Sequence, residues 1–336
     1  MKKALLFFIS LFIGIGLLVW IIRFVGWLQI KSAFLIFTGW HGAIIVLLTF
    51  LILLVGAWKW QTILKSQGYN LSNREIIAPY LTYFSITYLF PMVIFGGEIF
   101  RGYVLREKHE IPWGKAIASV LIDKILEATS FLVAILAGLV FFLLKIGLPP
   151  RNLAIILGGF LLFLFIIGIS FFYFRTFKKQ SIAKPLIKLF NRSKLPNGDI
   201  LEIEREIFNF FKIKKKVLWQ GFSLAFLRVA VTWLRCWVLI LFLGKSVGLL
   251  SALSVLGFYY FAMIIPIPTA LGSHEVVQVF AFNALGLGSS IAPAFTMIQR
   301  GAELMMAFIG LIIFFKLGLG LFQGLLLKKL ASFIDK

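Results

Sequence analysis

The chain has 336 residues, of which 61% are hydrophobic and 14% are charged, yet its formal net charge is +21. Several apolar runs of about 20 residues are each long enough to cross a bilayer. This composition excludes an ordinary soluble domain and predicts an all-α polytopic membrane protein. The positive charge predicts loops that face anionic lipid head groups, and no nucleic-acid partner is expected.

We expect six full spans, at about 4–27, 41–63, 116–144, 152–174, 217–244 and 289–314. The first apolar run is too long for the core of a typical signal peptide, and no small-residue cleavage site follows it. It is therefore expected to remain as the first span.

Two further apolar stretches, 76–90 and 251–265, are each followed by a break in the helical pattern. Helix-breaking prolines and glycines mark these breaks: Pro91, Gly96 and Gly97 in the first, and Pro266 and Gly272 in the second. Irregular backbone at membrane depth is tolerated where it is buried in protein or lines a hydrated cavity. The pattern predicts two re-entrant segments, each with a half-helix that begins after its break.

Residues 175–216 form a strongly basic segment, with twelve Lys or Arg residues against four acidic residues. A surface helix is expected from Asp199 to Phe211, because apolar residues recur there at helical spacing. The excess of Lys and Arg places this segment on the cytoplasmic side of the cell (inner) membrane. The basic N-terminus and the tail, 315–336, are expected on the same side.

Charged residues recur at matched intervals in the two halves of the sequence. Lys59 precedes Glu98 by 39 residues, and Arg235 precedes Glu275 by 40. The cations Lys124 and Arg300 follow these glutamates after 26 and 25 residues, and Glu127 and Glu303 each come three residues later. The pattern predicts two repeats, about 41–174 and 217–314, within one integral membrane domain, 1–336. The charges of the loops predict opposite orientations for the two repeats, as in alternating-access transport proteins.

Ten ionisable residues fall at expected membrane depth, five acidic and five basic: Glu98, Arg101, Asp123, Lys124, Glu127, Arg228, Arg235, Glu275, Arg300 and Glu303. Each would cost roughly 2.5–3.5 kcal/mol if unpaired. They are therefore expected to pair or to line a hydrated cavity.

A purely structural interpretation of these charges stays open. The two half-helix glutamates, Glu98 and Glu275, would complement helix dipoles. Lys124–Glu127 and Arg300–Glu303 would form local pairs at i,i+3 spacing.

The functional interpretation is that cations and half-helix N-termini receive an anionic group such as a lipid phosphate. The expected substrate-binding residues are Glu98, Arg101, Glu275 and Arg300. The expected supporting or gating residues are Lys59, Pro91, Gly96, Gly97, Asp123, Lys124, Glu127, Arg228, Arg235, Pro266, Gly272 and Glu303. Arg228 and Arg235 are seven residues apart and share one helical face.

Other chemistry finds little support in the sequence. His274-Glu275-Val-Val-Gln278 lacks the second histidine of the zinc-protease motif H-E-x-x-H. We expect no metal site, no cofactor and no catalytic residue.

Four segments together resemble the membrane region of lysylphosphatidylglycerol synthases: PMVIFGGEIFR (91–101), VLIDKILE (120–127), PIPTALGSHE (266–275) and QRGAE (299–303). That family includes stand-alone flippase-like proteins. The resemblance implies a lipid-translocating protein without the aminoacyltransferase domain of the full synthases. Its cargo would be an anionic or aminoacylated phospholipid, or a polyprenyl-phosphate-linked lipid.

Two alternatives remain. One is an integral-membrane enzyme that acts on a lipid phosphate, with the carboxylates as base or metal ligands. The other is an accessory subunit of a lipid or glycan synthesis system. Anionic membrane lipids are the expected partners, enzymes of lipid or glycan synthesis are further candidates, and the sequence does not indicate an oligomeric state.

Overall fold

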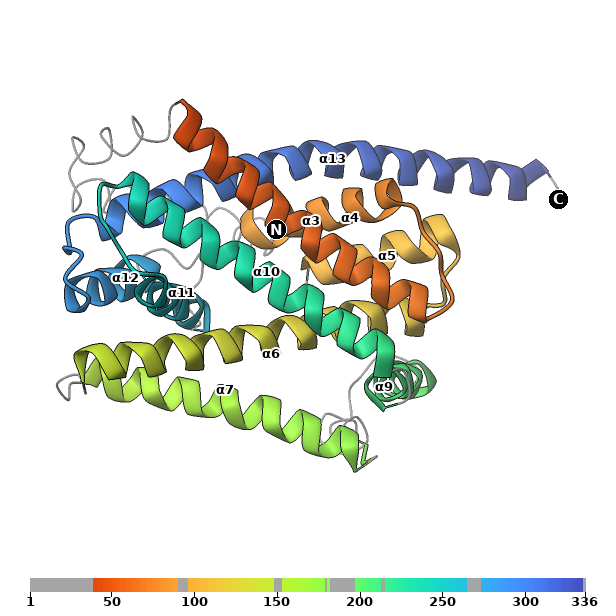
Figure 1. Cartoon of the computed structure of the whole chain (residues 1–336). Coiled ribbons are helices and arrows are strands. Elements are labelled where there is room, and N and C mark those ends of the chain that lie inside the picture. Colours follow the sequence, from red (N-terminus) through yellow and green to blue (C-terminus); the bar gives the residue numbers. More distant parts are fainter. Residues whose placement is uncertain are drawn as a thin grey trace. The chain divides into compact units, whose positions relative to one another are not determined.

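A computed structural model describes residues 39–89, 96–147, 153–178, 180–181, 197–212, 215–264 and 273–334, without the side chains of 153–155, 197–199, 273 and 318–334. Over these residues the structure consists of helices without strands (Figure 1), which confirms the all-α class. The described helices are α3 (Trp40–Ser66), α4 (Asn73–Leu89), α5 (Gly96–His109), α6 (Trp113–Ile146), α7 (Leu153–Phe177), α9 (Asn197–Lys212), α10 (Lys215–Phe242), α11 (Leu249–Ile264), α12 (Ser273–Ala284) and α13 (Ala292–Ile334).

Five segments of the described chain are long and apolar enough to cross a membrane: Trp40–Ser66, Trp113–Ile146, Ile156–Phe177, Lys215–Phe242 and Ala292–Leu317. They coincide with five of the six expected spans, so the polytopic membrane fold is confirmed. The remaining expected span, 4–27, lies outside the described residues. The expected tail, 315–336, does not begin a new element, because α13 continues as one helix to Ile334.

The two predicted breaks fall between short helices. The α4 helix ends at Leu89 and α5 begins at Gly96, while α11 ends at Ile264 and α12 begins at Ser273. Pro91, Pro266 and Gly272 lie outside the described residues. Within each pair the two short helices lie together, α4 with α5 and α11 with α12 (Figure 1).

Each pair of short helices stands between two long ones in the sequence. The order α3, α4, α5, α6 therefore matches the order α10, α11, α12, α13 in the lengths of its members. The re-entrant path and the opposite orientation of the two repeats stay predictions.

The chain forms two compact units that do not follow the boundaries of the predicted repeats. Unit 1 comprises Met1–Ile52, Leu126–Tyr173 and Ala225–Leu304, and unit 2 comprises Leu53–Ile125, Phe174–Leu224 and Met305–Lys336. Both units therefore draw on both halves of the sequence.

Unit 1 has a core of aliphatic and aromatic side chains from its helices. Leu239 on α10, Leu256 on α11, Phe282 on α12 and Phe295 on α13 are buried in it. The backbones of α6 and α11 meet closely at a glycine, because a Cβ on Gly138 would lie 2.7 Å from the carbonyl oxygen of Leu253. Small residues permit this approach between membrane helices.

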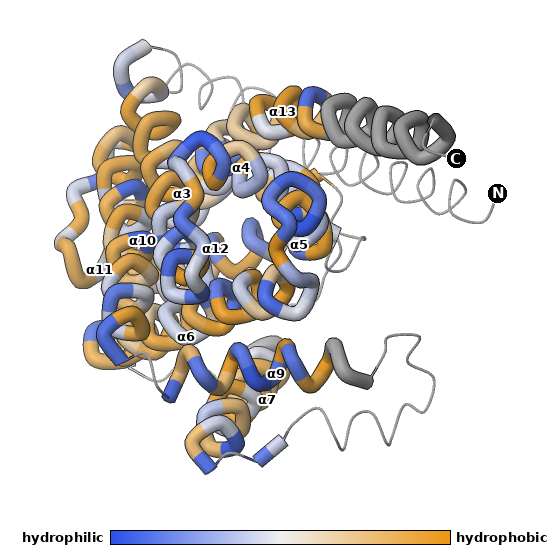
Figure 2. The backbone as a smooth tube through the Cα atoms, turned by 90° about the vertical axis from the view of Figure 1, so that its right-hand side faces the viewer, coloured by the Kyte–Doolittle hydropathy of each residue, from blue (hydrophilic) through white to orange (hydrophobic). Residues whose placement is uncertain are grey.

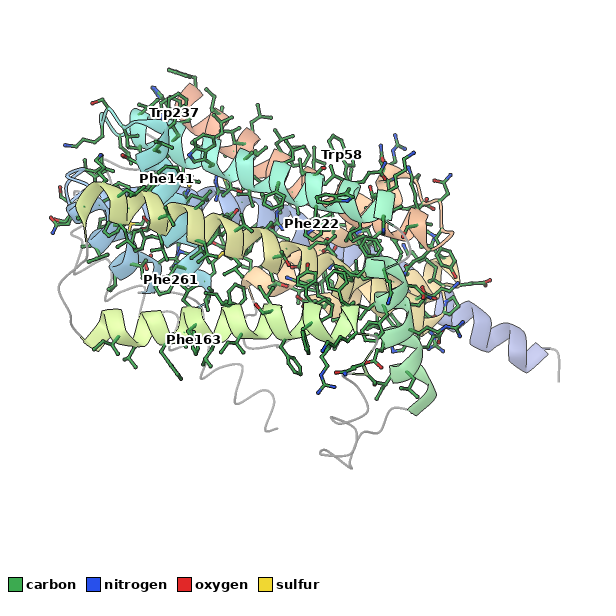
Figure 3. The ribbon with its side chains drawn as sticks, turned by 60° about the horizontal axis from the view of Figure 1, so that its bottom comes forward. Trp58, Phe141, Phe163, Phe222, Trp237 and Phe261 are labelled. Atoms are coloured by element: carbon green, nitrogen blue, oxygen red, sulfur yellow. The ribbon has the colours of Figure 1, made fainter. Side chains whose placement is uncertain are left out.

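Apolar side chains also face outward from α7. The outward-facing residues include Phe160, Phe163, Leu164, Ile167 and Phe171, among which Phe163 is labelled in Figure 3. An exposed apolar helix is suited to contact with lipid chains rather than with water.

Unit 2 has its own core, to which the helix of the basic segment contributes. Ile63 and Leu64 of α3, with Val104 and Leu105 of α5, are buried there. Hydrophilic and hydrophobic residues alternate along α9 (Figure 2), as the sequence predicted for a surface helix. The apolar face of α9 includes Phe210, which is almost fully buried and which the sequence pattern did not single out.

Candidate functional site

A fully buried cluster of charges lies in unit 2. Asp123 on α6 forms ion pairs with two cations. Its Oδ1 lies 3.0 Å from Lys59 Nζ on α3, and its Oδ2 accepts a hydrogen bond from Arg101 Nη1 on α5 at 3.0 Å. Lys59 Nζ also donates to the backbone carbonyl of Asp123 at 3.1 Å. One carboxylate therefore links three helices, and its charge is shared by two cations.

Aromatic rings surround the Arg101 guanidinium. Its central carbon lies 4.7 Å from the ring centre of Trp60, 5.3 Å from that of Tyr80 and 4.2 Å from that of Tyr83. Cation–π attraction is strong where water is excluded. The rings thus help to hold a cation that has no exposure to solvent.

A second ion pair of unit 2 is accessible. Glu98 Oε1, in the first turn of α5, lies 3.3 Å from Lys124 Nζ on α6. The side chains are 13% and 33% exposed, respectively. Glu98 therefore lies at the positive end of a helix dipole and directly after the break in the chain.

Gly97 fixes the start of α5 against α4. A Cβ at this position would lie 2.6 Å from the hydroxyl oxygen of Thr87 and 2.7 Å from the carbonyl oxygen of Tyr83. Only glycine permits this approach without displacement of α4. The predicted supporting role of Gly97 thus has a physical basis. The glycine allows the first turn of α5, which carries Glu98, to lie against α4.

Unit 1 also contains a largely buried ion pair, between Arg235 on α10 and Glu303 on α13. Arg235 Nη2 lies 2.9 Å from Glu303 Oε1, and the side chains are 2% and 15% exposed. The same carboxylate oxygen accepts the hydroxyl of Tyr259 on α11 at 2.9 Å. Arg235 also donates to the hydroxyl of Thr49 on α3 at 3.1 Å. Four helices of unit 1 meet in this network.

The second ion pair of unit 1 joins Glu275, which is itself largely buried, and Arg300, through which the pair is accessible. Glu275 is in the first turn of α12, and its Oε1 lies 3.4 Å from Arg300 Nη1 on α13. The side chains are 12% and 20% exposed. His274 precedes this glutamate and packs its ring against Tyr259, with centroids 5.2 Å apart. A further pair, Arg228 with Glu127, links α10 to α6.

The structure thus brings the predicted charges together across helices. Lys124 pairs with Glu98 and Arg300 pairs with Glu275, each across two helices. Local pairing at i,i+3 spacing stays a prediction. Arg101, expected to bind substrate, is fully buried against Asp123. Its position suits a side chain that holds α5 against α6, rather than one that contacts a ligand.

Two tyrosines were missed by the search for charges. Tyr83 lies against both Arg101 and Lys124, and Tyr259 donates to Glu303. Each follows the first cation of its half, Lys59 or Arg235, by 24 residues. That matched interval is the sequence signal that would have found them. Within the described residues, no group of three or more His, Cys, Asp or Glu side chains is arranged to hold a metal ion.

Comparison with known proteins identifies the family of the chain. Residues 7–310 match the family described as the lysylphosphatidylglycerol synthase TM region. The UPF0104 membrane protein MJ1595 of Methanocaldococcus jannaschii is 26% identical over 254 residues, which cover 72% of this chain and 74% of the relative. The UPF0104 membrane protein PH1989 of Pyrococcus horikoshii is 27% identical over 275 residues, which cover 74% and 78%. No solved structure matches the chain. The chain is therefore an integral membrane protein that belongs to the family of lysylphosphatidylglycerol synthase TM regions.

Proposed function

We propose that the protein is a flippase-like transporter that moves an anionic or aminoacylated phospholipid, or a polyprenyl-phosphate-linked lipid, between leaflets. The observation that carries this proposal is the recurrence of one accessible ion pair, Glu98–Lys124 in unit 2 and Glu275–Arg300 in unit 1. In each, a glutamate in the first turn of a short helix faces a cation on the next long helix.

Exchange of ionic partners is the proposed chemistry of these pairs. A lipid phosphate would replace the glutamate as the partner of Lys124 or Arg300, with bidentate contacts available to the arginine. The released carboxylate would stay at a helix N-terminus, whose dipole stabilises the negative charge. In an aminoacylated lipid, the same carboxylate would receive the ammonium group. The cost of separating each pair would thus be offset by contacts with the head group.

The buried charges would hold the site in place instead of contacting the lipid. Asp123 ties together α3, α5 and α6, the last two of which carry the Glu98–Lys124 pair, and Glu303 ties Arg235 to Tyr259. Removing one partner of a fully buried pair such as Arg101–Asp123 costs about 3–5 kcal/mol because the other charge is left uncompensated. Substitution there would therefore disturb folding before it disturbs lipid specificity.

The proposed setting is the cell (inner) membrane, with both termini cytoplasmic, and the transport needs no catalytic step by this chain. The excess of Lys and Arg in the segment 175–216 supports this orientation. The proposed partners are anionic membrane lipids and, as suppliers or users of the cargo, enzymes of lipid or glycan synthesis.

Transport of fluorescent lipids in liposomes tests the proposal. Glu98→Gln and Glu275→Gln are each expected to lower the rate of translocation per folded protein at least tenfold, which corresponds to about 1.4 kcal/mol in a barrier. Glu107→Gln is the matched control, because Glu107 lies on the same helix as Glu98 outside the ion pairs described above. Wild-type rates in both variants would refute the proposal and favour an accessory role for the protein.

A further inference from the structure

A groove in unit 2 lies apart from the ion pairs described above. It has a volume of about 950 Å³ and is lined by one face of α3 and one face of α10. Its lining residues are Thr62, Lys65, Ser66, Lys216, Val217, Trp219, Gln220, Ser223 and Leu224. We propose that this groove binds the head group of an anionic phospholipid at the membrane surface, with the phosphate between the ammonium groups of Lys65 and Lys216.

The position of the groove follows from the helices that form it. The membrane-spanning helix α3 ends at Ser66, and α10 begins at Lys215. The groove therefore lies where one span ends and another begins, which is the level of the lipid head groups rather than of the acyl chains. Trp219 is 70% exposed there, as expected for a tryptophan in a membrane–water interface. Figure 3 marks the same two helices by Trp58 on α3 and Phe222 on α10.

The lining groups suit the separate parts of a phospholipid. Lys65 and Lys216 supply two positive charges, and the first turn of α10 adds the positive end of a helix dipole. Gln220 and Ser223 offer an amide and a hydroxyl to the phosphate or glycerol oxygens. Val217 and Leu224 offer apolar surface to the upper part of an acyl chain.

The hydroxyls on the α3 side have a different role. Thr62 donates to the carbonyl oxygen of Trp58 at 3.0 Å, and Ser66 donates to that of Ile63 at 2.6 Å. These bonds use their protons within α3, so the two lysines are the principal anion-binding groups of the groove. The site is thus expected to distinguish lipids by the net charge of the head group.

A lipid is the occupant that fits these observations best. Basic pockets between helices at a membrane surface bind anionic head groups, and each Lys or Arg near an anionic membrane contributes about 1 kcal/mol. The net charge of +21 and the basic run of residues that ends at Lys216 bring such lipids to this surface. This second lipid site does not depend on the proposed transport.

Native mass spectrometry of the purified chain tests the inference. The probes are phosphatidylglycerol and phosphatidylcholine, added at equal concentrations in detergent. Wild type is expected to retain phosphatidylglycerol preferentially, Lys65→Gln and Lys216→Gln each to weaken its binding about fivefold, and the double variant about 25-fold. The matched control is Arg74→Gln with Lys215→Gln, which removes two exposed charges that do not line the groove.

The location within the groove is tested separately by fluorescence. Brominated phosphatidylglycerol in vesicles is expected to quench Trp219 emission, measured as the difference between wild type and Trp219→Phe, more than brominated phosphatidylcholine does. Lys65→Arg with Lys216→Arg is expected to keep this preference. Equal retention of the two lipids by wild type, or equal loss in the control and the groove variant, would overturn the assignment. Retained groove binding in a Glu98→Gln variant without transport would separate the two sites.

Discussion

Each unit has an accessible ion pair at the break in its chain. The two units differ in the buried side chains next to this pair. In unit 2 the residue three positions after Glu98 is Arg101, which is buried against Asp123. In unit 1 the residue three positions after Glu275 is Gln278, and the residue before Arg300 is Gln299. These two glutamines are also buried, with Gln278 donating to the carbonyl oxygen of Val255 and Gln299 to the sulfur of Cys236, both at 3.2 Å.

The two units thus share the accessible ion pair but not the type of buried side chain next to it. Charged side chains support the break in unit 2, whereas amides occupy the matching sequence positions in unit 1. A buried ion pair gains little over neutral groups of similar size, because desolvation offsets the attraction. What both breaks keep is the glutamate at the helix N-terminus and its cation on the next long helix. Under the proposed function, the accessible pairs would contact the lipid, and the buried residues next to them would stabilise the fold.

The largest effect on folding is expected from Asp123→Asn. This change leaves the buried cations Lys59 and Arg101 without their shared carboxylate, and it should lower the free energy of unfolding by about 3–5 kcal/mol. Chemical denaturation of the purified protein in detergent measures this loss. Glu98→Gln, which affects a pair whose lysine is 33% exposed, should lower stability by less than Asp123→Asn does. Equal losses in the two variants would remove the distinction between buried and accessible pairs.

A smaller loss is expected from Glu303→Gln in unit 1. The amide keeps an acceptor for Tyr259 but removes the negative charge beside Arg235, and hydrogen bonds to charged groups contribute about 1.5–3 kcal/mol. The same denaturation experiment applies. A Tyr259→Phe variant, which keeps the ion pair and removes the hydroxyl, should lose less than Glu303→Gln does. The reverse order would make the hydroxyl, rather than the charge, the support of this pair.

The smallest effect concerns the two glutamines. If Gln278 and Gln299 occupy positions equivalent to Arg101 and Asp123, the double variant Gln278→Arg with Gln299→Asp should recreate an ion pair. Its free energy of unfolding should exceed the value expected from adding the two single losses by about 0.5–3 kcal/mol. A double-mutant cycle measures this coupling. A coupling of zero would show that Gln278 and Gln299 are not spatially equivalent to Arg101 and Asp123.

The sequence predicted the fold well, because apolar length is a strong signal for membrane helices. It also located the starts of the helices that carry Glu98 and Glu275, where glycine and charge interrupt long apolar runs. It did not predict which charges pair, because Lys124 has Glu127 one turn away in sequence and meets Glu98 only through the packing of α5 on α6. The contacts of Arg101 with aromatic rings could not be predicted for a similar reason. In an apolar membrane sequence, nothing distinguishes Trp60 and Tyr80 from aromatic residues that face lipid.

One measurement tests the central claim that the accessible pairs act on the lipid and not on the fold. The double variant Glu98→Gln with Lys124→Met removes both charges of a pair and leaves neither one uncompensated. It should unfold at nearly the wild-type denaturant concentration, yet the translocation of fluorescent lipid in liposomes should stay at the low rate of Glu98→Gln. Recovery of wild-type translocation in this double variant would show that the pair serves only the structure, and would contradict the account.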